Sequence, residues 1–392
     1  MDFSLEPQHK AFLEELRAYM KALRASGDID LDAVASEYQS DLKSLGPLGL
    51  SFIRRLGHDG WLGVGTPKEY GGQGRSLVEQ WLFMEELKYN SLPAGQLLIQ
   101  SIIPALLFLA SPEVRARFLP LCLSGEIMVA IGYSEPGAGT DLAALQTRAS
   151  RVDGGYRVNG QKIWTTNAQS STHLWLAART GAPDSRHKGI SLFILPLDTP
   201  GISLQPIITQ SGERTNHVFF DDVFVAEENL VGTENGGWSL IMAQLNFERM
   251  YCVSEMMHEF HHVLQWWNTH QPEDDAERQA QLRELARMAA DAEVARLMAM
   301  RTAWLVAQGF VPAVEASILK FTLTGTHQRN SVDALRLMGP AGQLAVGQPG
   351  VPAHGFSGRA YLGTPAYTFG AGANELQRDM VADRGLGMSR GR

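Results

Sequence analysis

The sequence has little cysteine, no excess of positive charge and no long uninterrupted hydrophobic run. Its 392 residues include two cysteines, Cys122 and Cys252, which stand far apart and form no C-x-x-C motif. This excludes a disulfide scaffold or a zinc ribbon and favours a reducing, intracellular setting. The net charge of −8 argues against a general nucleic-acid-binding protein. The longest apolar stretch, residues 97–110, is interrupted by three polar or proline residues and is too short to cross a bilayer.

Several familiar signatures are also missing. The first sixteen residues are acidic and amphipathic, without the basic and apolar regions of a secretory signal or the arginines of a transit peptide. We therefore expect a cytoplasmic protein that associates with neither membranes nor nucleic acid. The G-x-G-x-x-G fingerprint and the P-loop motif are both absent, which excludes the two commonest ways of holding a phosphate.

One segment of the sequence matches a known metal-binding motif. Residues 258–262 match H-E-x-x-H, and on a helix His258 and His262 would share a face with Glu259 beside them. No G-x-x-H extension follows, and no third ligand can be identified. We therefore expect histidines on a helix surface and no metal site.

Hydrophobic periodicity divides the chain into three parts, within the two or three domains that its length predicts. Residues 1–125 show helical spacing, and residues 236–392 contain long helical stretches at 240–267, 276–308 and 312–338. A Gly/Pro-rich loop is expected at 339–358 and a last helix from Asn374. Residues 126–235 contain short strand-like runs, which predict a small antiparallel barrel or sandwich. The runs are 127–131, 156–158, 174–178, 190–195, 202–204 and 218–225.

Two segments of the β region have the composition of a ligand site. In Tyr-Ser-Glu-Pro-Gly-Ala-Gly-Thr-Asp at 133–141, a strand ends in a glycine-rich turn that offers hydroxyls and free backbone N–H groups. Asn-Gly-Gln-Lys-Ile-Trp-Thr-Thr-Asn at 159–167 adds an indole and two hydroxyls. Together they would suit a planar heteroaromatic ring. From these residues alone, two ordinary β-turns with a core tryptophan remain an alternative interpretation.

Four blocks resemble the acyl-CoA dehydrogenase family over nearly the whole chain. They lie at 59–74, at 133–141 with 159–167, at 218–232, and at 374–378 with 384–387. The resemblance implies an α+β fold with an N-terminal helical domain, a middle antiparallel β-barrel domain and a C-terminal four-helix bundle. It also implies FAD bound between the β domain and the bundle, and oxidation of an acyl-CoA to the trans-2-enoyl-CoA. The electrons would pass to an electron-transfer flavoprotein.

The resemblance also assigns binding residues. Those expected to hold FAD come from both ligand-site segments and from the start of the last helix: Tyr133, Ser134, Gly139, Trp164, Thr165, Thr166, Asn374 and Glu375. Those expected to contact the substrate are Thr140, Asn246, Arg249 and Ala371. Ser134 matches a position near the flavin pyrimidine edge, and Thr166 a position near N5.

The catalytic base requires a carboxylate, because a proton must be removed alpha to the thioester. Many family members carry a glutamate at the position that matches Ala371 here, and alanine cannot accept a proton. A second family solution places the glutamate on a bundle helix in an x-Glu-Arg motif. Leu-Asn-Phe-Glu-Arg at 245–249 matches that motif, which makes Glu248 the candidate base.

The sequence departs from the family's pattern at two segments that concern subunit assembly. An Arg-x-x-Phe-Gly segment that in the family reaches the FAD of a neighbouring subunit is absent from 266–275, and a Gln-Ile-x-Gly-Gly motif is replaced by Arg-Leu-Met-Gly-Pro at 336–340. The sequence is similar to actinobacterial members, including steroid side-chain enzymes built from one catalytic and one degenerate subunit. We expect a homo-oligomer or a heteromer with a related subunit. Two alternatives stay open: a flavin monooxygenase or oxidase on the same fold, and a non-catalytic subunit.

Overall fold

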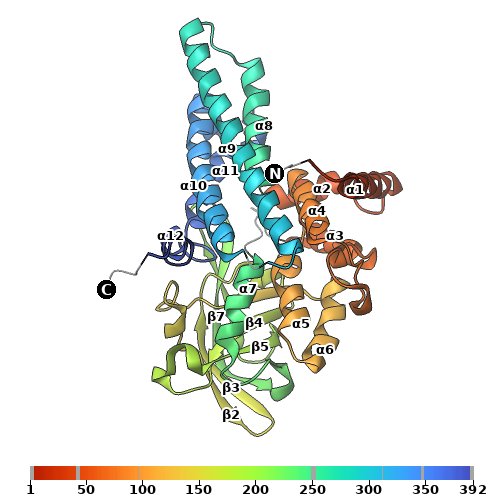
Figure 1. Cartoon of the computed structure of the whole chain (residues 1–392), viewed down its shortest axis with the longest axis vertical. Helices are drawn as coiled ribbons and strands as arrows, with labels where there is room; N and C mark the ends of the chain where they lie inside the picture. The colour runs from red at the N-terminus through yellow and green to blue at the C-terminus, as the bar shows by residue number, and fades with distance from the viewer. Residues whose placement is uncertain are drawn as a thin grey trace. The chain divides into compact units, whose positions relative to one another are not determined.

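A computed structural model describes residues 4–40, 45–95, 97–248, 253–310, 312–345 and 348–388. The chain divides into two compact units, each discontinuous in sequence (Figure 1). Unit 1 comprises Met1–Ala22, Leu77–Leu92 and Arg249–Arg392, and unit 2 comprises Leu23–Ser76 and Pro93–Glu248. The sequence predicts three continuous domains with boundaries after residues 125 and 235, and these boundaries remain a prediction.

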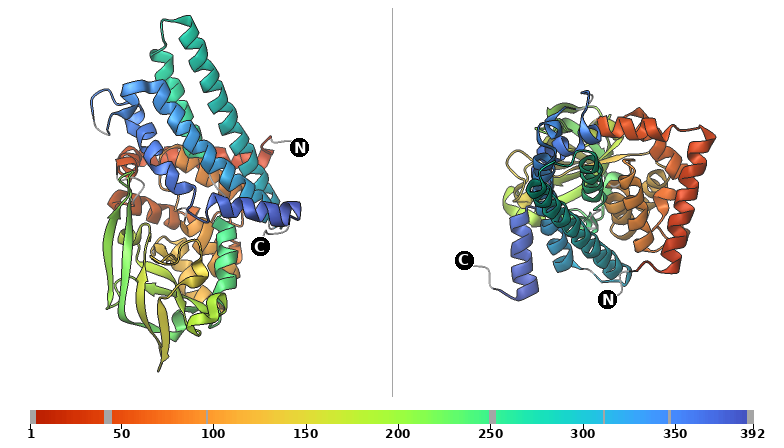
Figure 2. Two further views of the ribbon diagram at one scale, coloured as in Figure 1. Left: turned by 90° about the vertical axis from the view of Figure 1, so that its left-hand side faces the viewer. Right: turned by 90° about the horizontal axis from the view of Figure 1, so that it is seen from above.

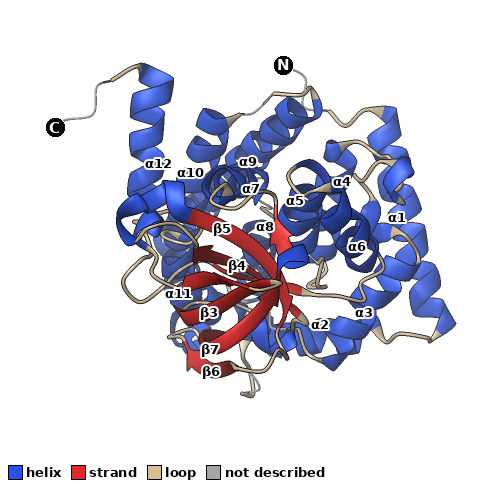
Figure 3. Ribbon diagram, turned by 90° about the horizontal axis from the view of Figure 1, so that it is seen from below, coloured by secondary structure: helices blue, strands red, loops and turns tan. Residues whose placement is uncertain are grey.

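Unit 2 is built on a mostly antiparallel eight-stranded sheet in the order β6-β7-β3-β2-β4-β5-β8, with β1 parallel to β4 (Figure 3). The strands are β1 (Val129–Gly132), β2 (Arg148–Val152), β3 (Gly155–Lys162), β4 (His173–Arg179), β5 (Ile190–Pro196), β6 (Ile202–Ile208), β7 (Arg214–Ala226) and β8 (Leu230–Val231). The six predicted strands are all present, and the predicted antiparallel β domain is confirmed.

The burial pattern explains which strands could be predicted. Nearly every residue of β4 and β5 is buried, so their apolar runs were easily recognised. Strand β2 was missed because Ala149 is the one buried position in the polar sequence Arg-Ala-Ser-Arg-Val. Pairing with β3, from Arg148 opposite Asn159 to Val152 opposite Gly155, creates this strand, since its own residues bury little.

The helices of unit 2 are α2 (Leu31–Ser40), α3 (Pro47–His58), α5 (Ile103–Phe108), α6 (Pro112–Leu123) and α7 (Gly237–Glu248), with a π-helix at Leu98–Ile102. Helix α7 packs against β5 and the π-helix. A glycine is needed where it begins: a Cβ on Gly237 would lie 2.8 Å from the carbonyl oxygen of Ile190.

Unit 1 is a helical bundle in which α10 packs against α8, α9, α11 and α12 (Figure 2). The helices are α4 (Leu77–Tyr89), α8 (Ser254–Thr269), α9 (Asp275–Ala307), α10 (Ala313–Met338), α11 (Phe356–Tyr367) and α12 (Asn374–Met380), with most of α1 (Pro7–Ser26). Apolar side chains of α8, α9 and α10, including Val263, Met288 and Leu337, form its core. Among the described residues, no helix has the length and apolar character that a membrane span requires.

The helical regions differ from the prediction in two places. The helix expected at 240–267 is two helices, because α7 ends at Glu248 and α8 begins at Ser254. Helix α11 was not predicted, and its first residues fall in the expected loop. Its sequence contains two glycines and Pro365, which lower helix propensity. Packing on α10 outweighs that propensity.

Candidate functional site

The glycine-rich turn of unit 2 leaves its backbone open on one side. Between β1 and the next segment, the amides of Glu135 and Ala138 each donate to the other residue's carbonyl, both at 3.0 Å. A Cβ added to Gly137 or Gly139 would meet no atom within 4 Å. Thr140 is exposed at the end of the turn. A ligand can therefore approach this backbone closely.

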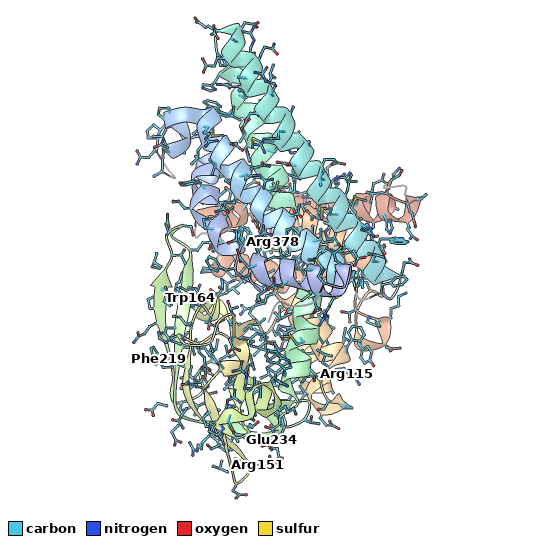
Figure 4. All side chains as sticks on the ribbon, turned by 60° about the vertical axis from the view of Figure 1, so that its left-hand side comes forward. Arg115, Arg151, Trp164, Phe219, Glu234 and Arg378 are labelled. Carbon is cyan, nitrogen blue, oxygen red and sulfur yellow. The ribbon has the colours of Figure 1, made fainter. Side chains whose placement is uncertain are left out.

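The second ligand-site segment is joined to this turn. The amide of Ile163 donates to the carbonyl of Ser134 at 2.9 Å. Trp164 follows in a left-handed conformation (φ 61°) and leaves 57 % of its surface exposed (Figure 4). A bulky residue with positive φ stores strain, which is typical of functional sites. The two segments that the sequence singled out thus form one surface.

The threonines after the indole face in different directions. Thr166 is exposed, whereas Thr165 is fully buried. The amide of Thr165 donates to the carbonyl of Asn216, and Nδ2 of Asn216 donates to the carbonyl of Thr165, both at 3.0 Å. Among the described residues, Oγ1 of Thr165 has no hydrogen-bond partner. Such a buried orphan hydroxyl usually belongs to a ligand or an ordered water.

A buried lysine holds the turn in place. Nζ of Lys162, at the end of β3, donates to the carbonyl of Tyr133 (3.1 Å) and to Oε1 of Glu135 (2.7 Å). The amides of Gln146 and Thr147 also donate to Glu135, at 2.6 and 2.9 Å. Burial lowers the pKa of Lys162 to about 8, although Glu135 opposes the shift. Burial alone would raise the pKa of Glu135, but Lys162 and these hydrogen bonds hold it below its ordinary value.

These features fit a flavin. An exposed indole, a bare glycine backbone and an unpaired buried hydroxyl together suit a flat ring with hydrogen-bonding edges. Unit 2 brings together the following residues predicted to bind cofactor or substrate: Tyr133, Ser134, Gly139, Thr140, Trp164, Thr165 and Thr166. The side chain of Tyr133 is buried and points into the protein, so only its backbone is available to a ligand on this surface.

The candidate base belongs to the last turn of α7. Asn246 and Glu248 are both in this helix, and α7 ends at Glu248. The side chains of these two residues, and all of Arg249, lie outside the described residues. One turn before Glu248, Gln244 is completely buried. Sequence reasoning missed Gln244, because a single glutamine in an apolar helix gives no distinctive pattern.

Tyr133 and Gln244 belong to a chain of buried hydrogen bonds. Nε1 of Trp175 in β4 donates to the Tyr133 hydroxyl at 3.0 Å, and that hydroxyl donates to Oε1 of Gln244. Nε2 of Gln244 donates to Oγ of Ser101 in the π-helix at 2.8 Å. The chain therefore connects the sheet, the glycine-rich turn, α7 and the π-helix within unit 2.

Unit 1 carries three more of the predicted residues, Ala371 on the loop before α12 and Asn374 and Glu375 at the start of that helix. Ala371 has a left-handed backbone (φ 52°), Asn374 is buried and Glu375 is exposed. Nζ of Lys320 in α10 donates to the carbonyl of Thr368 (2.8 Å) and to Oδ1 of Asn374 (2.7 Å), so it ties the two ends of the loop together. Lys320 was also missed by sequence reasoning, since it reads as an ordinary helix lysine.

The H-E-x-x-H residues of α8 do not converge on a common point. Nδ1 of His258 lies 2.9 Å from the carbonyl oxygen of Tyr89, and Nε2 of His262 lies 2.6 Å from Nε2 of His258. Glu259 is fully buried, and its Oε2 lies 3.2 Å from Nε2 of His327. The two histidines are half-buried, not fully on the surface as expected. Among the described residues, no three potential ligands are grouped for a metal ion.

The amino-acid sequence matches three known protein-domain families. These are the acyl-CoA dehydrogenase N-terminal domain over residues 6–126, the middle domain over 130–223 and the C-terminal domain over 235–386. The chain is 37 % identical to acyl-CoA dehydrogenase FadE26 of Mycobacterium tuberculosis over 409 residues, covering 100 % of this chain and 99 % of that protein.

Two solved structures are similar along the whole chain. The steroid ACAD Tcur3481-Tcur3483 superimposes with a TM-score of 0.91 at 35 % identity, and the ChsE4-ChsE5 complex from Mycobacterium tuberculosis with 0.89 at 34 %. In both cases 100 % of each chain is covered. Sequence and fold agree: the chain belongs to the acyl-CoA dehydrogenase family, whose members are FAD-dependent oxidoreductases acting on CH–CH groups.

Proposed function

We propose that this chain dehydrogenates an acyl-CoA thioester to the trans-2-enoyl-CoA with Glu248 as the catalytic base. One observation carries the assignment of the base. The position that holds the base in many relatives is Ala371, on a left-handed loop, while Glu248 belongs to α7 and stands in the alternative x-Glu-Arg motif. A carboxylate is the group that this proton abstraction requires.

Residues of this chain and one cofactor account for the proton, the electron pair and the hydride of the reaction. The Glu248 carboxylate takes the alpha proton, and the electron pair of that C–H bond forms the new double bond. The Ala371 N–H donates to the thioester carbonyl, where negative charge develops. Bound FAD supplies an acceptor for the hydride that leaves the beta carbon. Thr140, Asn246 and Arg249 contact the substrate.

The chain's own residues support FAD as the cofactor. Ser134, Gly139 and residues 164–166 provide hydroxyls, an open backbone and an indole for the flavin ring. The backbone of Tyr133 completes this surface. The family resemblance adds Asn374 and Glu375, at the start of α12, to the proposed cofactor residues. The buried Thr165 hydroxyl gains a partner when the cofactor binds.

A steroid side-chain thioester is the substrate class we propose. Support comes from the steroid ACAD, which is 35 % identical over the full length of both chains. The names of this structure and of the ChsE4-ChsE5 complex each join two proteins. We therefore infer a heteromer with a related subunit. From the family resemblance we also propose an electron-transfer flavoprotein as the electron acceptor.

The base is tested by moving the carboxylate. Glu248→Gln should bind FAD as the parent does but lower the rate of flavin bleaching by acyl-CoA at least a thousandfold, because no group then accepts the proton. Adding Ala371→Glu should restore part of that rate. Full activity in Glu248→Gln would contradict the assignment.

The substrate class is tested by anaerobic mixing with a panel of thioesters, from butyryl-CoA to cholanoyl-CoA. Faster bleaching by the steroid thioester supports the proposal, and faster bleaching by a short chain contradicts it. Rapid reoxidation by oxygen instead of electron-transfer flavoprotein would favour an oxidase. A purified chain that binds neither FAD nor a thioester, alone or with a related subunit, would favour a non-catalytic subunit.

A further inference from the structure

The buried chain from Trp175 to Ser101 has a fixed direction. An indole N–H can only donate, so the Tyr133 hydroxyl accepts from Trp175, and its single hydrogen is donated to Oε1 of Gln244. The amide orientation of Gln244 is thereby set, and its NH₂ group donates to Ser101. The four side chains are buried, so water cannot replace a lost bond.

The two central residues belong to the two parts of the site in unit 2. Tyr133 directly precedes Ser134 in the glycine-rich turn, and Lys162 binds the carbonyl of Tyr133. Gln244 precedes Glu248 by four residues on α7, and positions four apart lie on the same face of a helix. The turn is therefore anchored to the face of α7 on which position 248 lies.

The strength of this anchor has a physical basis. Helix α7 is otherwise apolar over most of its length, and apolar packing tolerates small shifts along or around a helix axis. A hydrogen bond with a fixed donor and acceptor does not tolerate them, because it weakens steeply when distance or angle changes. The Tyr133–Gln244 bond therefore fixes both the register and the rotation of α7.

We propose that Tyr133 and Gln244 are positioning residues for the dehydrogenation: their hydrogen bond sets the placement of the Glu248 base relative to the turn that carries Ser134. The inference rests on the proposed function, because it takes Glu248 as the base. Proton abstraction requires the reacting atoms to lie about 3–3.5 Å apart and aligned, so a small shift of α7 slows the reaction without preventing binding.

The test compares two buried tyrosines of unit 2. Tyr133→Phe removes the central hydroxyl of the chain. Tyr156→Phe is the matched control, because Tyr156 is also a buried tyrosine and its hydroxyl binds Arg151 (2.6 Å) and Glu234 (3.1 Å). Arg151 and Glu234 lie at the end of the β domain away from Trp164 (Figure 4). Both variants lose one hydroxyl that has two hydrogen-bond partners; the bonds of Tyr133 are buried and those of Tyr156 are part-buried.

Both variants are assayed as the complete FAD-loaded enzyme with the most active thioester of the panel. We expect Tyr133→Phe to lower kcat 10- to 100-fold with KM changed less than threefold. We also expect it to raise the kinetic isotope effect of an α-deuterated substrate, since proton removal becomes slower. Tyr156→Phe should keep kcat within twofold while losing similar thermal stability. Gln244→Met should behave like Tyr133→Phe, and the double variant should be no slower than either single variant.

Several outcomes overturn the inference. One is an unchanged kcat and isotope effect in both Tyr133→Phe and Gln244→Met. Another is an equal loss of kcat in the Tyr156→Phe control. If Tyr133→Phe fails to fold or loses FAD, Gln244→Met alone decides, because Gln244 lies outside the glycine-rich turn. Glu248→Gln, measured alongside, separates the two proposals: an active Glu248→Gln defeats the base assignment, whereas an inactive one with fast Tyr133→Phe defeats only the positioning role.

Discussion

Each unit of this protein holds one of its loops with a buried lysine, but the two lysines have different partners. Lys162 in unit 2 binds the carbonyl of Tyr133 and the carboxylate of Glu135. Lys320 in unit 1 binds the carbonyl of Thr368 and the amide oxygen of Asn374. Both lysines are almost fully buried, at 0 % and 1 % exposure. The bonds described for Lys162 thus include an ion pair, whereas the two bonds described for Lys320 go to neutral oxygens.

This difference in partners determines which buried group loses its hydrogen-bond donor when each lysine is removed. A buried carboxylate without its cation is far costlier than a buried carbonyl without a donor, because charge is harder to desolvate. Unit 2 should therefore be the more sensitive to loss of its lysine. Two substitutions and one titration test this difference, and a third substitution tests the backbone of the unit 1 loop.

The largest effect is expected for Lys162→Met. The Glu135 carboxylate would be left buried without a cation, which should lower the free energy of unfolding by about 3–5 kcal/mol. Bound FAD, read from its visible absorbance, should fall in parallel. Urea unfolding measures the change, and restoring most of the loss by adding Glu135→Gln would show that the stranded charge is the cause. A loss below about 1 kcal/mol would contradict the ion-pair account.

Lys320→Met should cost less, about 1–3 kcal/mol, since the stranded acceptors are neutral. Asn374 keeps its hydrogen bonds with Thr324, at 3.0 and 3.1 Å, which limits the damage at one end of the loop. The same urea titration gives the value. A cost equal to or above that of Lys162→Met would remove the distinction between the two loops.

A pH titration of stability tests the burial of the Lys162 ammonium. The pKa of Lys162 is lowered to about 8 in the folded protein, from 10.5 when exposed. Between these values the unfolded chain binds more protons than the folded one, so the contribution of Lys162 to stability rises with pH. From pH 7 to pH 9 it should rise by about 1 kcal/mol relative to Lys162→Met. A difference that is flat or falls over this range would show that the ammonium is not desolvated.

The smallest effect concerns the backbone of the unit 1 loop. Ala371 adopts a left-handed conformation (φ 52°), which costs an alanine roughly 1–2 kcal/mol and a glycine little. Ala371→Gly should therefore raise the free energy of unfolding by up to about 1 kcal/mol, after the greater entropy of an unfolded glycine is subtracted. Thermal unfolding detects the gain. Destabilisation would indicate that the methyl group has a packing role.

The sequence predicted those strands and turns that depend on the local pattern of residues. Apolar runs identified β4 and β5, and the motif at 133–141 placed a glycine-rich turn that the structure joins to residues 159–167 through Ser134 and Ile163. The three-part family fold followed from the order of such motifs. The roles assigned to Glu248 and to the cofactor residues remain predictions.

The remaining features arise from contacts distant in sequence. Tyr133 and Gln244 are 111 residues apart, and Lys320 and Asn374 are 54 apart, so neither pair has a local signature. The left-handed backbone of Trp164 depends on its surroundings, because an isolated tryptophan avoids that conformation. Helix α11 was missed for the same reason, since packing against α10 stabilises a sequence of low helix propensity.

The discontinuous make-up of unit 1 also matters while the chain is being synthesised. Helix α4 is buried on most sides, with Trp81, Phe83 and Met84 fully covered, and it packs against α8 and α9. These partners follow it by more than 150 residues, since α8 begins at Ser254. At a translation rate of 5–20 residues per second, α4 waits roughly 10 to 30 seconds for them. During that interval its apolar surface is a target for chaperones and for aggregation, so the yield of this protein should depend on chaperone supply more than its folded stability suggests.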